Sequence, residues 1–207
     1  PEIDVFTIKA KDGTDLYARM IKPLNFDANK KYPVIVYVYG GPHAQLITES
    51  WLSGANNFFL FLAQQGYIVW TVDSRGSANR GFEFESAIWR NCGSIEVSDQ
   101  MDGVNYLKSL PYVDAERIGV DGWSYGGFMT ISLKLKNPGV FKTATAGGPV
   151  IDWKWYEIMY GERYMSSPED NKEGYEKSSL LNYADQLEGK LLVIHGAQDP
   201  TVVMQHS

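Results

Sequence analysis

Residues 117–136 read RIGVDGWSYGGFMTISLKLK. The first part, RIGVD, is a short apolar segment of the kind found in buried strands. It runs directly into Gly-x-Ser-x-Gly at 122–126 and then into FMTISLKLK, which predicts a helix. A strand, a sharp turn centred on Ser124 and a helix form the context in which this motif presents a nucleophilic serine. The competing interpretation, a glycine-rich turn with an incidental serine, is disfavoured by that context.

Further strands and helices are predicted on both sides of this turn. Apolar runs typical of strands that are buried on both faces of a mainly parallel sheet lie at 32–39, 67–73, 141–148 and 190–196. Helix-like stretches lie at 51–65, 98–110 and 124–136. This alternation predicts an α/β fold with a doubly wound, mainly parallel sheet.

The polarity of three further segments also predicts local structure. Residues 2–8 and 15–21 alternate apolar and polar side chains around Asp12-Gly13, which predicts an opening β-hairpin. The polar stretch 166–178 is expected to form an exposed excursion.

Composition narrows the class of protein. With 207 residues and 44% hydrophobic side chains, the chain suits a single domain over 1–207. A formal net charge of -6 without a basic stripe argues against nucleic acid as a partner. No apolar run reaches the roughly 18 residues of a membrane span. Cys92 is the single cysteine, and no cluster has metal-ligand spacing, so we expect neither a disulfide within the chain nor a metal or other cofactor.

A serine nucleophile of this kind needs an acid and a histidine, which follow it in that order along the chain. The segment KLLVIHGAQDP at 190–200 is a late strand followed by a loop carrying Asp199, the expected acid. An aspartate that only forms a turn before Pro200 is the competing interpretation. His206 follows Asp199 too closely to come from a further loop, while His43 and His195 precede the acid and are expected to be structural.

The catalytic histidine is therefore expected beyond Ser207. The chain starts at Pro1 rather than Met and ends in VVMQHS, so we expect it to be an excised part of a longer protein. On this interpretation the α/β-hydrolase fold is truncated before the loop that bears the histidine, and the isolated chain is expected to be inactive.

Six motifs together resemble the dipeptidyl peptidase IV branch of the prolyl oligopeptidase family, and they keep its order. They are VYVYGGP, DSRGSANRGF, GWSYGGFMT, PVIDWKWYEIMYGERYM, PEDNKEGY and LLVIHGAQDP. The wording of AGGPVIDW, YEIMYGERY and HGAQDPTVVMQHS also resembles bacterial prolyl tripeptidyl aminopeptidases.

The resemblance implies a serine-type exopeptidase that releases short N-terminal peptides after proline through an acyl-enzyme. Its substrate would be a peptide with proline near the N-terminus. Family members pair the hydrolase domain with a β-propeller of the same chain, whose acidic residues bind the substrate amine. A bacterial periplasm or cell envelope is the compartment suggested. A homodimer, and the choice between dipeptide and tripeptide release, stay open.

The resemblance also assigns roles to single residues. Ser124 would be the nucleophile and Asp199 the acid. The hydroxyl of Tyr39, which opens the turn YGGP, and the backbone N–H of Tyr125 would form the oxyanion hole.

Aromatic residues at 153, 156 and 160 have helical spacing and would share one face of a helix. Periodicity alone favours a core position for such a stripe. The resemblance instead assigns it to a pocket for the proline ring, lined by Tyr125, Val150, Trp153, Tyr156, Tyr160 and Val202. Trp155 lies off that face.

Two alternatives were weighed against a post-proline peptidase. An esterase or acylaminoacyl peptidase is disfavoured because Tyr-Gly-Gly-Pro stands where carboxylesterases carry a His-Gly-Gly-Gly turn. A non-catalytic binding module of the same fold would be expected to lose Ser124 or Asp199, and both are present.

Overall fold

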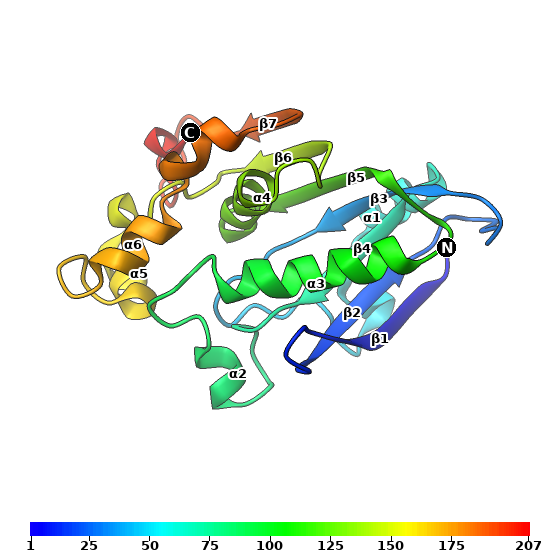
Figure 1. Cartoon of the computed structure of the whole chain (residues 1–207), viewed down its shortest axis with the longest axis horizontal. Coiled ribbons are helices and arrows are strands. Elements are labelled where there is room, and N and C mark those ends of the chain that lie inside the picture. The colour runs from blue at the N-terminus through cyan, green and yellow to red at the C-terminus, as the bar shows by residue number, and fades with distance from the viewer.

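The computed structural model describes residues 1–207 and contains one mixed, mostly parallel sheet with helices on both faces (Figure 1). The seven strands lie in the order β1-β2-β4-β3-β5-β6-β7. The pairs β1–β2 and β2–β4 are antiparallel, and the other neighbours are parallel. The strands are β1 (Ile3–Lys9), β2 (Asp15–Ile21), β3 (Tyr32–Tyr37), β4 (Ile68–Asp73), β5 (Val113–Trp123), β6 (Thr143–Gly147) and β7 (Lys190–Ile194). The predicted α/β class, the opening hairpin and the mainly parallel sheet are confirmed.

Short helices and turns of 3-10 helix connect these strands. The α-helices are α1 (Asn57–Gln64), α2 (Phe82–Ser86), α3 (Ile95–Ser109), α4 (Tyr125–Lys136), α5 (Ile158–Met165) and α6 (Lys172–Ser178). The 3-10 segments are η1 (Trp51–Gly54), η2 (Trp153–Trp155), η3 (Leu180–Gln186) and η4 (Met204–His206). No helix is long and apolar enough to cross a membrane.

Alternation along β4 explains how the helices divide between the two faces. All six residues of β4 are buried. Trp70 and Val72 point into the larger core beneath α3 and α4, whereas Val69 packs with Phe59 of α1 on the opposite face. Figure 1 shows α3 and α4 side by side in front of the sheet and α1 behind it. This doubly wound arrangement brings the carboxyl ends of the parallel strands to one edge, where α4 begins.

The structure corrects two predicted segments. The helix expected over 51–65 begins only at Asn57, because the side chain of Asn56 accepts a hydrogen bond from the N–H of Phe59 and caps α1 there. The excursion expected over 166–178 contains α6, which buries Tyr175 and Ser178. The polar residues cover only the outer side of α6, so the polar composition of this segment does not mean that all of it is exposed.

β7 also differs from expectation, because its side chains are largely exposed. Leu192 is 56% exposed and Ile194 is 44% exposed. β7 is the last strand of the sheet and no helix of the chain covers it, so the predicted burial on both faces is wrong.

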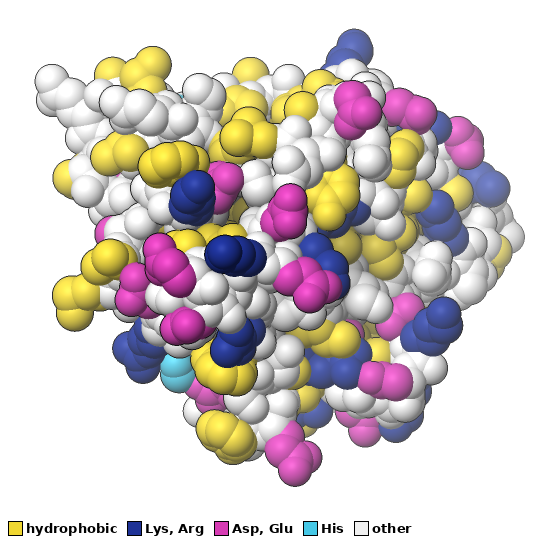
Figure 2. Space-filling model, turned by 60° about the vertical axis from the view of Figure 1, so that its left-hand side comes forward, with side chains coloured by type: hydrophobic (Ala, Val, Ile, Leu, Met, Phe, Trp, Pro, Cys, Tyr) yellow, Lys and Arg dark blue, Asp and Glu magenta, His cyan; other side chains and the backbone are white.

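The end of the molecule that carries α5 and α6 combines charge with exposed apolar side chains. Figure 2 brings this end forward and shows acidic and basic side chains interspersed with hydrophobic ones. The exposed hydrophobic residues of this region are Trp155, Ile158, Met159 and Leu181.

Candidate active site

Ser124 occupies a strained turn between β5 and α4. Its φ of 59° and ψ of -117° are unusual for a residue with a side chain. The turn closes so tightly that a Cβ on Gly122 would lie 2.4 Å from the carbonyl oxygen of Gly126. A Cβ on Gly126 would lie 2.4 Å from the carbonyl oxygen of Val38. Both glycines of the motif are thus required by close backbone approach, and the turn projects Ser124 from the edge of the sheet.

The backbone around Ser124 leaves one donor free. The N–H of Ser124 donates to the carbonyl of Gly147 at the end of β6, with an N–O distance of 2.8 Å. Tyr125 is the first residue of α4, so its N–H has no acceptor within the helix. The positive end of the helix dipole also points toward this position.

Tyr39 follows β3 and faces the serine. Burial raises the pKa of Tyr39, and a hydrogen bond with the Ser124 side chain offsets part of that rise. The phenol is therefore protonated at neutral pH and able to donate. A Cβ on Gly41 would lie 2.7 Å from the Tyr39 ring and 2.9 Å from the Tyr125 ring, so glycine lets the YGGP turn pass between them.

Asp199 reaches the same edge from the loop after β7. The N–H of Gly148 donates to the carbonyl of Ile194 at 2.7 Å, which joins the ends of β6 and β7. A Cβ on Gly148 would lie 3.6 Å from Oδ2 of Asp199. The loop carrying Asp199 therefore packs against the strand end that holds the N–H of Ser124.

The two carboxylate oxygens of Asp199 have different surroundings. Oδ1 accepts from the N–H groups of Thr201 at 2.9 Å and Val202 at 3.0 Å, and these bonds lower the pKa of Asp199. Oδ2 accepts no hydrogen bond within the chain. Asp199 thus forms the turn that the competing interpretation predicts. Its carboxylate is nevertheless ionised, and Oδ2 remains available to a further donor.

Each of the three histidines has a partner away from Ser124. His43 contacts Glu85 through Nδ1. His195 lies 2.6 Å from the carbonyl oxygen of Val202 through Nε2 and 2.5 Å from the hydroxyl of Ser207 through Nδ1. The buried ring of His206 accepts from the N–H of Ile151 at 3.2 Å. None of the three links Asp199 to Ser124.

The aromatic residues expected to line a pocket do come together, although not on one helix. Trp153 lies in η2, the chain is extended at Tyr156, and α5 begins only at Ile158. The predicted single helix is wrong, because the extended segment separates two short helices. The ring centroids of Trp153 are nevertheless 5.4 Å from Tyr156 and 5.8 Å from Tyr160.

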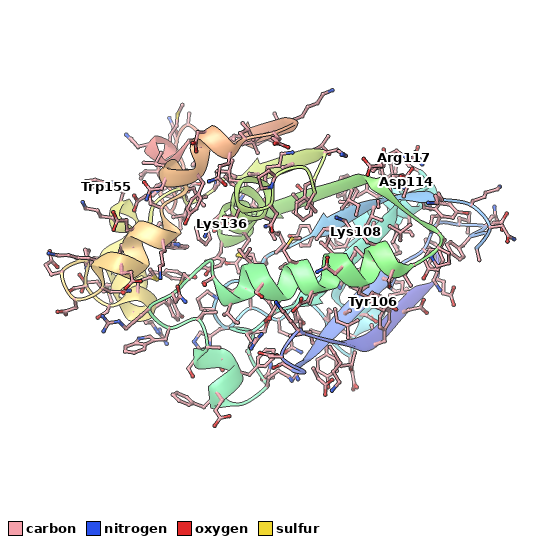
Figure 3. All side chains as sticks on the ribbon, viewed as in Figure 1. Tyr106, Lys108, Asp114, Arg117, Lys136 and Trp155 are labelled. Atoms are coloured by element: carbon pink, nitrogen blue, oxygen red, sulfur yellow. The ribbon has the colours of Figure 1, made fainter.

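The other predicted lining residues adjoin this cluster from different elements. The Tyr125 ring lies 5.1 Å from Trp153, centroid to centroid, and Val150 and Val202 belong to the same buried core. Trp153, Tyr125, Val150 and Val202 are buried, whereas Tyr156 and Tyr160 are half-buried and form the accessible part. Trp155, labelled in Figure 3, is 68% exposed and does not belong to the cluster.

Two residues at the site were missed by sequence reasoning. Glu96 at the start of α3 is completely buried and accepts a hydrogen bond from the Tyr125 hydroxyl at 2.6 Å. His206 fixes the backbone of Ile151, next to the predicted pocket residue Val150. The helix predicted over 98–110 begins at Ile95 in the structure, so Glu96 lay outside the predicted helix and no sequence signal singled it out.

Comparisons with known proteins identify the family. The profile of the prolyl oligopeptidase family matches residues 54–207. The chain belongs to the prolyl oligopeptidase family. Within that family it falls in the branch of dipeptidyl peptidases 4 and 8. Dipeptidyl peptidase 8 from Homo sapiens is 37% identical over 209 residues, which cover 99% of this chain.

Solved structures of the prolyl oligopeptidase family give the same answer for the fold. A Bacteroides ovatus protein assigned as a dipeptidyl aminopeptidase IV superposes with a TM-score of 0.98 at 60% identity over 100% of this chain. Dipeptidyl peptidase 4 from Porphyromonas gingivalis superposes with a TM-score of 0.93 at 38% identity over 99% of it. The chain spans 23% of human dipeptidyl peptidase 8 and 29% of each solved chain.

Proposed function

We propose that this chain carries the nucleophile, acid and oxyanion hole of a serine exopeptidase that cleaves after proline near the N-terminus of peptides. The observation that carries the proposal is the strained conformation of Ser124, whose side chain meets the Tyr39 phenol at the edge of the sheet. The family membership supports it, because the relatives of this branch are dipeptidyl peptidases.

In the proposed reaction, the Ser124 hydroxyl attacks the carbonyl carbon that follows the proline ring and gives its proton to a histidine base. The tetrahedral intermediate places negative charge on the former carbonyl oxygen, which the Tyr39 hydroxyl and the Tyr125 N–H stabilise. One such donor typically supplies ~3–4 kcal/mol of transition-state stabilisation. The base then protonates the leaving amine, and water hydrolyses the acyl-enzyme by the reverse sequence.

The acid would act through that histidine. Oδ2 of Asp199 is free to accept from an imidazole N–H, which would fix the tautomer and stabilise the imidazolium. Because His43, His195 and His206 have other partners, we propose that the base comes from a part of a longer protein outside these 207 residues. The chain alone would then be inactive or nearly so.

The aromatic cluster would recognise the proline ring. Proline is a small apolar ring without an N–H, so its pocket needs predominantly apolar walls. Tyr156 and Tyr160 offer ring faces above the buried Trp153. Burial raises the pKa of Tyr160, so this wall stays uncharged at any ordinary pH.

The test is the substrate preference of the full-length protein. We expect Ala-Pro-anilide to be cleaved with a higher kcat/KM than Ala-Ala-anilide, and we expect Ser124→Ala to abolish cleavage. A peptide with proline at positions two and three would show, from the length of its product, whether dipeptides or tripeptides leave. Rapid hydrolysis of a short-chain nitrophenyl ester, without cleavage after proline in either the anilide or the peptide, would contradict the proposal and favour an esterase.

A further inference from the structure

Glu96 is a buried carboxylate that the proposed reaction does not use. It lies in the first turn of α3 with no exposed surface. Its oxygens accept from the N–H of Gly93 at 2.9 and 3.1 Å and from the N–H of Ser94 at 3.0 Å. Oε1 also accepts from the hydroxyl of Tyr125 at 2.6 Å.

The surroundings of Glu96 contain no close ion pair. Lys136 of α4, labelled in Figure 3, donates to the carbonyl of Gly93 at 3.0 Å and is the nearby cation whose pKa the Glu96 charge raises against the effect of burial. The thiol of Cys92 adjoins the Tyr125 hydroxyl. Burial raises the pKa of Glu96, so keeping its carboxylate here costs stability. An apolar residue would fill this place at a lower cost in stability. We therefore looked for a contribution of the carboxylate other than stability.

Tyr125 is the residue that both parts of the proposed site share. Its N–H begins α4 beside Ser124, and its ring lies between Gly41 of the YGGP turn and Trp153 of the aromatic cluster. On one side a Cβ on Gly41 would lie 2.9 Å from its Cγ, and on the other the Trp153 ring is 5.1 Å away. A rotation of this ring would therefore disturb the turn that holds Tyr39 and the wall that faces proline.

We propose that Glu96 is a positioning residue that holds the Tyr125 ring by its hydroxyl, and thereby sets both the oxyanion hole and the proline pocket. The backbone fixes Tyr125 at one end of the side chain, and the Glu96 hydrogen bond fixes it at the other. Glu96 is in turn held by two backbone N–H groups ahead of α3, so the anchor belongs to a rigid element. This inference rests on the proposed function of the chain.

A purely structural role for Glu96 predicts a different result. Its bonds to Gly93 and Ser94 shape the loop before α3, and losing them would destabilise the fold without changing the chemistry of the folded molecules. The two roles separate if activity is expressed per folded active site. They also separate in Tyr125→Phe, which removes the hydroxyl and leaves the bonds to Gly93 and Ser94 in place.

The experiment measures kcat and KM of the full-length protein and of three variants, Glu96→Gln, Tyr125→Phe and the double variant. Ala-Pro-anilide and Ala-Ala-anilide are the substrates, and titration with a fluorophosphonate gives the concentration of active sites. We expect each single variant to lower kcat for Ala-Pro-anilide by about tenfold or more, because small misplacements at a reacting centre are costly. The preference for proline should fall as well, and the double variant should be no slower than the worse single variant.

Two controls calibrate this result. Leu107→Ala opens a cavity under the same helix and should lower thermal stability while leaving kcat per active site unchanged. Glu173→Gln removes an exposed carboxylate that pairs with Lys177 and should change neither property.

The outcomes distinguish this inference from the proposed function. If the wild type releases neither dipeptides nor tripeptides after proline, the proposed function fails and takes this inference with it. If the wild type is active while Tyr125→Phe and the folded fraction of Glu96→Gln keep its kcat and proline preference, only this inference is overturned. Additive losses in the double variant would also overturn it, because Glu96 would then act independently of the Tyr125 hydroxyl.

Discussion

At the scale of single residues, the candidate site depends on positions where the backbone leaves no room for a side chain. Gly126 is the clearest case, since it lies inside α4 and yet its missing Cβ is replaced by the carbonyl of Val38. Such contacts with backbone atoms cannot relax by a change of rotamer. The tight turn around Ser124 therefore depends on the absence of side chains at these glycine positions.

Gly126→Ala should lower the free energy of unfolding by roughly 3 kcal/mol or more, because the new methyl group would overlap a backbone oxygen. Gly161→Ala is the matched control. Gly161 also lies in a helix, but a Cβ there would meet nothing closer than 3.5 Å. That change should be neutral or stabilise by about 0.5–1 kcal/mol. Urea denaturation of both variants measures the difference, and equal stabilities would contradict the close approach.

His206 should make stability depend on pH. Its Nδ1 accepts from the N–H of Ile151, which requires the neutral ring, and burial lowers its pKa below the ordinary value of 6.5. The unfolded chain therefore binds a proton at higher pH than the folded chain does. This contribution to stability is present above about pH 6.5 and is lost as the pH falls toward the folded pKa.

The comparison with His206→Asn isolates this effect. Wild type should lose more stability between about pH 7 and about pH 5 than the variant does, as measured by urea denaturation at each pH. If both proteins show the same dependence on pH, the neutral His206–Ile151 bond is not what the chain relies on.

Residues that follow strands were predictable, and residues that meet through packing were not. Ser124, Tyr39 and Asp199 each follow the carboxyl end of a parallel strand, so the topology places them at one edge of the sheet. The contact between Glu96 and Tyr125 joins two helices whose relative position no local pattern encodes. An acidic residue near the start of a helix does not by itself indicate such a buried contact, because acidic residues in that position are common on surfaces.

At the scale of elements, periodicity predicted the existence of strands and helices better than their surroundings. The aromatic spacing at 153–160 predicts one helix, but two extended residues, Tyr156 and Glu157, divide it. The rings still cluster because Trp153 is anchored in the core and Tyr160 stacks on it with an interplanar angle of 18°. Burial of β7 was misjudged because a strand's position in the sheet is a property of the complete topology.

Arg75 joins three segments that are distant in sequence. Its guanidinium contacts Asp99 of α3 at 2.6 Å and Asp12 of the opening hairpin at 2.5 Å. The side chain of Asp99 has no exposed surface, so it depends on this partner.

Arg75→Met should lower the free energy of unfolding by about 3 kcal/mol, because it leaves the Asp99 carboxylate buried without a counter-charge. The control is Arg117→Met, since Arg117 is an exposed residue of β5 that pairs with Asp114 of the same strand (Figure 3). Loss of that pair should cost no more than about 1 kcal/mol. Chemical denaturation distinguishes the two, and a small loss for Arg75→Met would contradict the anchoring role.

At the scale of the whole molecule, the sheet is asymmetric in how it is covered. β4 is enclosed on both faces, whereas β7 exposes Leu192, Val193 and Ile194. An uncovered edge strand with apolar side chains is a template for association. We therefore expect the 207-residue chain to self-associate as its concentration rises.

Val193→Lys should reduce that association by placing a charge on the exposed strand. Val5→Lys is the matched control on β1, the opposite edge of the sheet, where Val5 is exposed to a similar degree. Sedimentation velocity over a range of concentrations measures the effect. Equal association of the two variants would show that β7 is not the surface involved.

The central claim is that Ser124 is a nucleophile whose base lies outside this chain. Mass spectrometry after treatment with a fluorophosphonate tests it most directly, applied in parallel to the full-length protein and to the 207-residue chain. The account predicts rapid, stoichiometric modification of Ser124 in the full-length protein and little or none in the chain alone. Modification at another residue of the full-length protein, or equally rapid labelling of the isolated chain, would contradict it.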